Sequence, residues 1–173
     1  MYSATARYGR RGIVMSAISA IDIALWDILG KVSQMPVYRL LGGTTPALTP
    51  YASAGYYMDG KGTAELQAEV LSYVEMGFNT IKIKVGGAPV NEDIKRVAAV
   101  REVLGPDIDF GIDANNAWDY PTALKMARAC EKYNVLFFEE PMSSDFLQDC
   151  IRLAKNTDVP IAGYETMLTA YGM

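Results

Sequence analysis

The chain has 173 residues, of which half are apolar and 21% are charged, with 15 Gly, 8 Pro and no His. This is the composition of an ordinary globular protein with enough apolar residues for one sizeable core. The net charge of −4 is spread over interspersed acids and bases without a basic tract. The sequence therefore gives no electrostatic reason to expect a nucleic acid or a membrane surface as a partner.

Cysteine usage and the longest apolar run bear on the compartment. Cys130 and Cys150 lie in stretches with helical periodicity and have neither CxxC spacing nor a histidine to share a metal. We expect both to be buried thiols of a reducing compartment, not a disulfide or zinc ligands. The longest apolar run, residues 17–29, contains two aspartates and is too short to span a bilayer, and we find no signal-peptide pattern. We therefore expect a cytoplasmic protein.

The N-terminal part of the chain predicts one helix followed by turns. Residues 1–12 show no periodicity and are expected to form an irregular segment. Apolar residues at helical spacing over residues 14–29 predict a mostly buried helix that ends at Gly30. A Gly-Gly pair at residues 42 and 43, with a proline soon after it, then interrupts the chain before its pattern changes.

From residue 51 onward, short apolar strands alternate with amphipathic helices. The expected strands are Tyr51–Ala54, Thr80–Val85, Ile108–Asp113, Val135–Glu139 and Val159–Glu165. The expected helices run from a Thr63 cap to Gly77, from an Asn91 cap to Gly105-Pro106, from near Asp119 with Pro121 in the first turn, and from Ser143 or Ser144 to Asn156. Such alternation predicts right-handed βαβ units and a parallel sheet.

Two α/β folds satisfy this alternation, a doubly wound open sheet and a (β/α)₈ barrel of the TIM type. The open sheet usually carries a glycine-rich phosphate-binding turn after its first strand. Here the first strand is followed by Ala54-Gly55-Tyr56-Tyr57, and the Val85-Gly86-Gly87 turn lacks the required glycine spacing. The pattern therefore favours the barrel.

Carboxylates stand at the ends of three successive expected strands. Asp113, Glu139 and Glu165 follow one another at intervals of 26 residues (113 to 139 and 139 to 165). Barrel enzymes carry catalytic groups at the carboxyl ends of their strands, so one βα unit per interval would set the three acids around one rim. Three unpaired carboxylates there would repel one another, so we expect either that one of them is protonated or that a cation lies among them. A site with oxygen donors and without His or Cys favours Mg²⁺. The alternative is that each acid only caps the next helix.

Two lysines on the second expected strand suggest a base. Lys82 and Lys84 are two residues apart, so they point to the same face of the strand. Inside a barrel, mutual repulsion and desolvation would lower a lysine pKa, as a general base requires. The alternative is an edge strand with solvent-facing lysines. Because the outer face of a barrel strand packs against helices, Ile81, Ile83 and Val85 suit that face and leave the lysines inside.

In combination, these motifs resemble the enolase superfamily. The resemblance rests on Lys-x-Lys at residues 82–84, Asp-x-Asn at 113–115, Glu-Glu-Pro at 139–141 and Gly-x-Glu at 163–165, with the helix AISAIDIALWDILGK at 17–31 and the Pro36-Val37 and Leu41-Gly42-Gly43 that follow it. It extends over residues 13–170. In the muconate-lactonizing and dipeptide-epimerase branch an Asp takes the position of Tyr164, so Glu165 resembles the mandelate racemase and acid-sugar dehydratase branch.

The resemblance implies a role for each motif residue. The Mg²⁺ ligands would be Asp113, Glu139 and Glu165. Lys84 would remove the proton next to a substrate carboxylate, Lys82 would lower the pKa of Lys84 and contact that carboxylate, and Asn115 would be a supporting polar contact. Mg²⁺ would neutralise the charge of the resulting enediolate. The implied enzyme is a dehydratase (a lyase) or a racemase (an isomerase) of a hydroxy acid such as an acid sugar. The alternatives are an epimerase or lactonizing enzyme, or an inactive partial barrel that serves only as a metal-binding or assembly module.

The resemblance also implies a domain organisation. Residues 1–46 would be the last part of an N-terminal α+β capping domain, including its closing helix, and residues 47–173 would be the first part of the barrel, about five βα units with the metal site. A whole barrel has eight units and takes about 250 residues. The later strands, which in this branch carry a His-Asp dyad and a further acid, would then be absent. Because a half-barrel leaves two sheet edges unpaired and an apolar interior uncovered, we expect either a partial gene product or a homo-oligomer.

Overall fold

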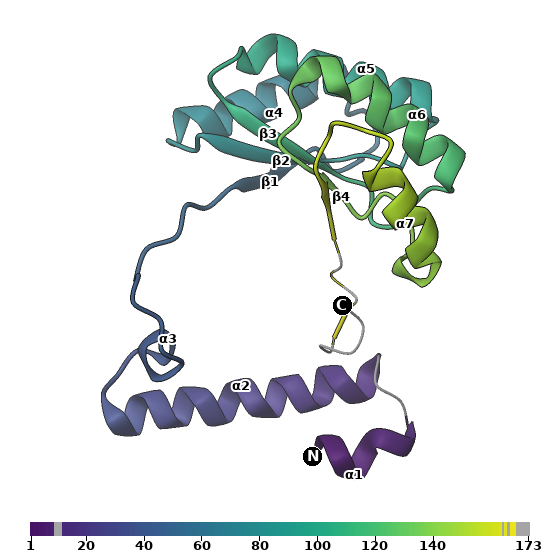
Figure 1. Cartoon of the computed structure of the whole chain (residues 1–173). Helices are drawn as coiled ribbons and strands as arrows, with labels where there is room; N and C mark the ends of the chain where they lie inside the picture. Colours follow the sequence, from purple (N-terminus) through teal and green to yellow (C-terminus); the bar gives the residue numbers. More distant parts are fainter. Residues whose placement is uncertain (9–11, 164, 166, 169–173) are drawn as a thin grey trace. The chain divides into compact units, whose positions relative to one another are not determined.

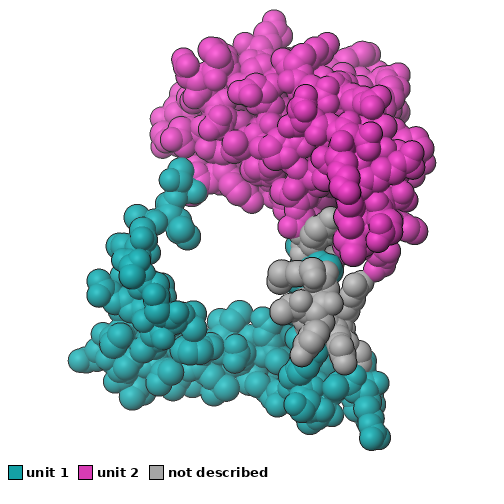
Figure 2. Space-filling view, in the orientation of Figure 1, with its two compact units in different colours: residues 1–49, 165–173 teal, residues 50–164 magenta. Residues whose placement is uncertain are grey.

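The computed structural model describes residues 1–8, 12–163, 165, 167 and 168. The chain divides into two compact units, residues 1–49 with 165–173 and residues 50–164 (Figure 2). The larger unit contains the β-sheet, and each unit is considered by itself below.

The smaller unit is built around one long helix. The short helix α1 (Tyr2–Thr5) and the 3₁₀ turn η1 (Ala6–Tyr8) precede α2 (Ile13–Ser33), and the short α3 (Val37–Leu40) follows it. The turns over residues 2–8 depart from the irregular segment expected there, because a single helical turn needs no apolar periodicity. The prediction that the long helix is mostly buried is wrong for the described residues, since only Gly30 of α2 is buried. Two short helices are too small to cover its 21 residues.

The end of α2 was also predicted wrongly. The helix continues past Gly30 to Ser33 and is capped by Gln34, whose φ of 53° is left-handed and whose N–H donates to the carbonyls of Gly30 and Lys31. Gly30 instead permits a close approach, because a Cβ there would lie 3.1 Å from the carbonyl oxygen of Met35. At 21 residues, α2 is longer than the apolar run judged from sequence, and by length and composition alone it could cross a membrane. Core helices of soluble proteins meet the same criterion.

The larger unit contains a five-stranded parallel sheet whose strands follow chain order. The strands are β1 (Ala52–Ala54), β2 (Thr80–Lys84), β3 (Asp109–Asp113), β4 (Phe138–Glu139) and β5 (Ile161–Ala162), and each pairs in parallel with the next. A doubly wound sheet reverses its strand order partway, whereas a β/α barrel adds each strand on the same side. The observed order is therefore that of a barrel. Each observed strand lies within its predicted range, and β4 and β5 are shorter than predicted.

The helices that connect these strands form the outer layer of the unit. They are α4 (Thr63–Glu75), α5 (Val90–Leu104), α6 (Tyr120–Cys130) and α7 (Leu147–Ala154), with the 3₁₀ turns η2 (Glu131–Tyr133) after α6 and η3 (Ser144–Phe146) before α7. Helices α4, α5 and α6 lie on one face of the sheet (Figure 1). Asp119 caps α6 as predicted, accepting the Thr122 N–H at 3.0 Å. Helix α4 is capped at Gly62, one residue before the predicted Thr63, because the Gly62 N–H donates to Glu65 at 2.8 Å.

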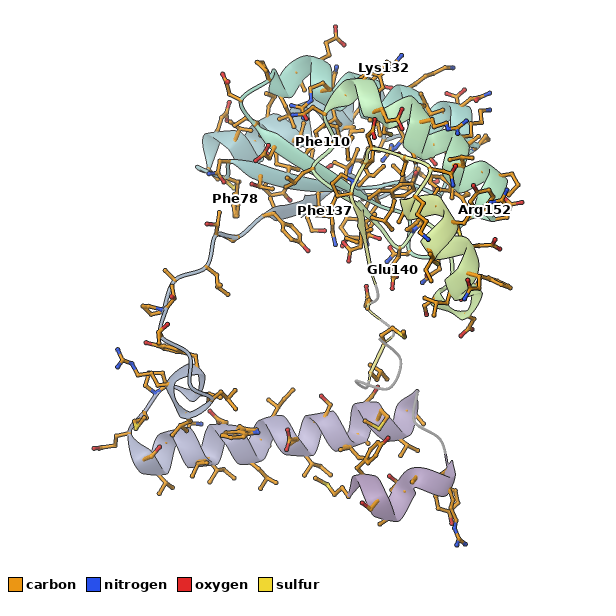
Figure 3. All side chains as sticks on the ribbon, in the orientation of Figure 1. Phe78, Phe110, Lys132, Phe137, Glu140 and Arg152 are labelled. Carbon is orange, nitrogen blue, oxygen red and sulfur yellow. The ribbon has the colours of Figure 1, made fainter. Side chains whose placement is uncertain are left out.

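The core lies between the helices and the sheet. Its fully buried strand residues are Ala54, Ile81, Ile83, Phe110, Ile112 and Phe138. Phe110 lies on the helix side, where the Arg101 guanidinium stands 4.6 Å over its ring (Figure 3). Cys130 and Cys150 are free and buried, as predicted. Because alternate residues of a strand face opposite ways, the burial of the two β2 isoleucines against the helices places the β2 lysines on the inner face.

Candidate metal centre and base

The carboxyl ends of β2, β3 and β4 bring two lysines and two acids together. The register of the sheet pairs Lys84 with Asp113 and Asp113 with Glu139. Lys82 lies two residues before Lys84 on the same face, one step deeper in the sheet. These four residues, Lys82, Lys84, Asp113 and Glu139, are called the rim cluster below.

Each lysine of the rim cluster contacts carboxylate oxygens. Lys82 Nζ lies 2.7 Å from Glu139 Oε2 and 3.1 Å from Asp113 Oδ2. Lys84 Nζ donates to Asp113 Oδ2 and to Asn115 Oδ1, both at 2.6 Å. Asp113 is fully buried and also accepts the backbone N–H of Asn115 at 3.0 Å. A single ammonium group, that of Lys82, therefore bridges the two acids.

These contacts shift the pKa values of the cluster. Burial alone would raise the pKa of Asp113, but hydrogen bonds from Lys84, the Asn115 amide and Lys82 lower it overall. Burial alone would lower the pKa of Lys82, but hydrogen bonds with Glu139 and Asp113 raise it overall. The prediction that repulsion between the two ammonium groups lowers a lysine pKa is therefore wrong for Lys82, because carboxylates pair with both lysines.

Tyrosine rings and a cavity adjoin the lysines. The Tyr51 ring lies 5.2 Å from Lys82 Nζ and the Tyr56 ring lies 5.7 Å from Lys84 Nζ, within the range of cation–π attraction. A cavity of 440 Å³ beside Lys84 is bounded by Tyr56, Tyr57 and Asn115, among others. Sequence reasoning assigned no role to the tyrosines. For Tyr56 and Tyr57 the available signal was their position directly after the first strand, where barrel enzymes place site residues.

Glu140, the second acid of the Glu-Glu-Pro motif, is held in an unusual conformation next to the rim cluster. Its φ of 42° lies in the left-handed region and its side chain is buried. Asn116 Nδ2 donates to Glu140 Oε2 at 3.0 Å, and the Glu140 N–H donates to the carbonyl of Ala162 at 3.0 Å. Figure 3 shows Glu140 where the chain leaves β4. A left-handed non-glycine residue at a strand end is a type of strain often found at functional sites, and sequence reasoning missed it.

The third predicted ligand lies outside the unit that contains the rim cluster. Glu165 is an exposed turn residue that belongs to the smaller unit. The register pairs Glu139 with Ala162, so Glu165 comes three residues after the aligned position. Tyr164, which decided the branch, lies outside the described residues. Among residues 1–8, 12–163, 165, 167 and 168, no group of three or more His, Cys, Asp or Glu is placed to hold a metal. The structure thus brings two of the three predicted ligands together, and Glu165 stays a prediction.

The donors of the rim cluster fit a magnesium ion. Asp113 and Glu139 already converge on one positive charge, the Lys82 ammonium, with their oxygens no more than 3.1 Å from it. Mg²⁺ in proteins is commonly held by one or two carboxylates and completes its octahedral shell with water or substrate oxygens. The two acids could therefore hold Mg²⁺ in exchange for the ammonium.

Sequence comparison relates the chain to known enzymes. The family model described as "Mandelate racemase / muconate lactonizing enzyme, N-terminal domain" matches residues 2–42, and the one described as "Enolase C-terminal domain-like" matches residues 65–173. An arabinonate dehydratase of Saccharolobus solfataricus is 47% identical over 171 residues, which make up 99% of this chain and 46% of that enzyme. Helix α2 lies within the residues that the N-terminal model matches.

Solved structures give the same relationship. The 3,6-anhydro-D-galactonate cycloisomerase of Zobellia galactanivorans aligns with a TM-score of 0.88 at 42% identity, covering 95% of this chain and 46% of that one. A racemase from Streptomyces coelicolor with bound magnesium aligns with a TM-score of 0.87 at 36% identity, covering 96% and 46%. The chain therefore spans about half the length of the relatives it matches.

Proposed function

Since the chain belongs to the mandelate racemase/muconate lactonizing enzyme family of the enolase superfamily, and its sheet is the corresponding part of a (β/α)₈ barrel, we propose that this protein removes the proton next to a substrate carboxylate with the help of Mg²⁺. The observation that carries the proposal is the convergence of Asp113 and Glu139 on one ammonium beside Lys84. The substrate would be a hydroxy acid such as an acid sugar. The names of the relatives, which include an arabinonate dehydratase, support this class.

The acids of the site would hold the metal. Asp113 and Glu139 provide two carboxylates at the ends of neighbouring strands, and Glu165 after β5 would provide the third. When bound, Mg²⁺ stabilises the second negative charge that develops on the substrate carboxylate as the neighbouring proton leaves. The relative with bound magnesium supports this choice of metal.

Lys84 is the residue best placed to take the proton. Its side chain borders the 440 Å³ cavity, in which the substrate carbon would lie. The Lys84 ammonium is held by Asp113 and Asn115, and it can act as a base only after releasing a proton. With a metal bound, Asp113 would serve the ion instead of the Lys84 ammonium. Lys82, whose pKa is raised by its two carboxylate partners in the metal-free protein, would contact the substrate carboxylate.

The fate of the deprotonated substrate separates the candidate reactions. Loss of a neighbouring hydroxide gives dehydration, and reprotonation on the opposite face gives racemisation. In the sequence, Glu165 lies one residue after the position at which the muconate branch carries an Asp. This favours dehydration or racemisation over the reactions of an epimerase or lactonizing enzyme of that branch. The other alternative is an inactive partial barrel that serves as a metal-binding or assembly module. We further propose a cytoplasmic protein, because its two buried, free cysteines suit a reducing compartment.

Solvent exchange tests the proposal without knowledge of the reaction product. The protein is incubated in D₂O with Mg²⁺ and a panel of aldonates and aldarates, and deuterium at the carbon next to the carboxylate is measured by NMR. We expect Mg²⁺-dependent exchange into at least one acid sugar and none into dipeptides. Exchange into dipeptides alone would favour the muconate branch. Mg²⁺ binding without exchange into any acid would favour the inactive module and contradict the proposal.

A further inference from the structure

A second buried polar cluster lies behind the carboxyl end of β2. Asp93, in the first turn of α5, is fully buried, and Arg96, one turn later, is almost fully buried. The Tyr57 hydroxyl donates to Asp93 Oδ1, and the Arg96 guanidinium lies 4.2 Å over the Tyr57 ring. Burying charged groups costs free energy unless they are paired and hydrogen-bonded. The partners that compensate this cost show what the cluster holds in place.

Those partners are backbone groups on either side of Lys84. Arg96 Nη2 donates to the carbonyl of Gly55 at 2.7 Å and, more weakly, to the carbonyl of Lys84 at 3.4 Å. The N–H of Gly86, two residues after Lys84, donates to Asp93 Oδ2 at 2.8 Å. The helix α5 therefore holds the chain directly at Lys84 and just beyond it. The same guanidinium ties this point to the loop after β1.

The loop after Lys84 is also confined by close packing. A Cβ at Gly86 would lie 2.6 Å from the Cβ of Ala117, and a Cβ at Gly87 would lie 2.6 Å from the ring of Tyr57. Gly86 has a φ of 92°, a value that residue types other than glycine rarely adopt. The loop is thus held in close contact with both Tyr57 and Ala117.

We propose that Tyr57, Asp93 and Arg96 are positioning residues for the base Lys84. They fix the backbone on both sides of Lys84 and thereby set the height and direction of its side chain at the rim cluster. This assignment rests on the proposed function, in which Lys84 takes the substrate proton. Proton transfer is sensitive to such placement, since a displacement of about 1 Å can lower a rate by about 100-fold.

The Tyr57→Phe variant tests this assignment most cleanly. It keeps the ring under Arg96 and removes only the hydroxyl that donates to Asp93. We expect kcat for exchange of the substrate proton to fall about tenfold, with KM and the Mg²⁺ dissociation constant within about twofold of wild type. The Gly86 amide should exchange with solvent about tenfold faster, while the buried Ile112 amide in β3 is unchanged. Tyr120→Phe is the matched control, because its ring also carries a guanidinium, that of Arg152, at 4.2 Å.

A second pair of variants distinguishes the proposed role from a loss of activity caused by misfolding. Arg96→Lys keeps a donor for the Gly55 and Lys84 carbonyls and should retain more of kcat than Arg96→Met. Equal loss in Tyr57→Phe and Tyr120→Phe, a rise in KM alone, or unchanged Gly86 exchange in Tyr57→Phe would each overturn the assignment. The proposed function fails separately, if wild type exchanges no substrate proton with Mg²⁺ present. The Gly86 amide then still decides whether the cluster holds the loop, because that measurement needs no substrate.

Discussion

Asp113 and Glu139 are cross-strand partners, set opposite each other by the register of β3 and β4, and the Lys82 ammonium lies 3.1 Å from the first and 2.7 Å from the second. Two carboxylates this close to each other are stable only when a cation lies between them or one of them is protonated. In the proposed function, Mg²⁺ and the Lys82 ammonium therefore compete for the same two acids.

Replacing Lys82 should lower the stability of the metal-free protein and raise its affinity for Mg²⁺. Lys82→Met removes the bridging ammonium and leaves Asp113 buried with fewer partners, so we expect the metal-free protein to lose about 2–3 kcal/mol in unfolding free energy. Because the competing cation is gone, Mg²⁺ should bind several-fold more tightly. Urea unfolding and calorimetric titration measure the two effects. Weaker Mg²⁺ binding in a folded Lys82→Met protein would show that the ammonium supports the metal site instead of competing for it.

Replacing Lys84 should abolish proton exchange and spare the metal. Lys84→Met removes the proposed base, so deuterium exchange into the substrate should fall by at least about 100-fold, with Mg²⁺ binding retained. The control is Lys95→Met on α5, whose exposed ammonium pairs with Glu92 at 2.8 Å. NMR of the substrate in D₂O reports the exchange. Exchange at the wild-type rate in Lys84→Met would assign the base to another residue.

The protein should lose stability at alkaline pH. Burial raises the pKa of Tyr57, and its hydrogen bond to Asp93 adds to this. The pKa of Lys82 is raised as well, because its carboxylate partners outweigh burial. The folded state therefore holds both protons more tightly than the unfolded state. Their contribution is complete below the unfolded pKa values of about 10 and is lost as pH rises above them toward the folded values.

Urea unfolding between pH 8 and pH 11 checks this dependence. The unfolding free energy should begin to fall near pH 10, and it should fall less steeply in Tyr57→Phe, which lacks one of the two protons. A free energy that rises over this range would contradict the predicted direction of both shifts.

Arg101 should contribute to stability at the end of the sheet away from the site. Its guanidinium donates to four backbone carbonyls, those of Gly105, Ile108, Tyr133 and Asn134, at 2.6 to 2.9 Å. Arg101→Met would leave these acceptors, three of which are partly buried, without their donor, at a cost of roughly 2–3 kcal/mol. Arg128→Met, at an exposed position of α6, is the control. Equal unfolding free energies for the two variants, measured in urea, would refute this role.

Local sequence patterns predicted the larger unit well. The strands β2 and β3 and the helix α6 were placed closely, because the alternation of apolar with other residues and the Asp119 cap with its following proline are local signals that extend over a few residues. The end of α2 was missed, because Gly30 looks like a helix terminator and instead makes room for the Met35 carbonyl. That use of glycine depends on where the chain goes next, which periodicity does not show.

The residues of the site could be predicted from the sequence, but the pairing of lysines with carboxylates could not. Strand ends and the 26-residue interval singled out Asp113 and Glu139, and the alternation of β2 singled out Lys82 and Lys84. The pairing of Lys82 with Glu139 spans 57 positions, so the sequence could not show that a carboxylate would raise the lysine pKa. The cluster of Tyr57, Asp93 and Arg96 was missed for the same reason. In the sequence, Asp93 resembles any acidic residue in the first turn of a helix, and only the structure shows that it is fully buried.

Calorimetric titration with Mg²⁺ tests the central claim most directly. If Asp113 and Glu139 share one metal ion, wild type should bind Mg²⁺ and Glu139→Gln should not, while Glu92→Gln, at an exposed acid of α5, should bind as wild type does. Circular dichroism would confirm that each variant is folded. Equal Mg²⁺ binding by wild type and a folded Glu139→Gln protein, or no binding by folded wild type, would contradict the account.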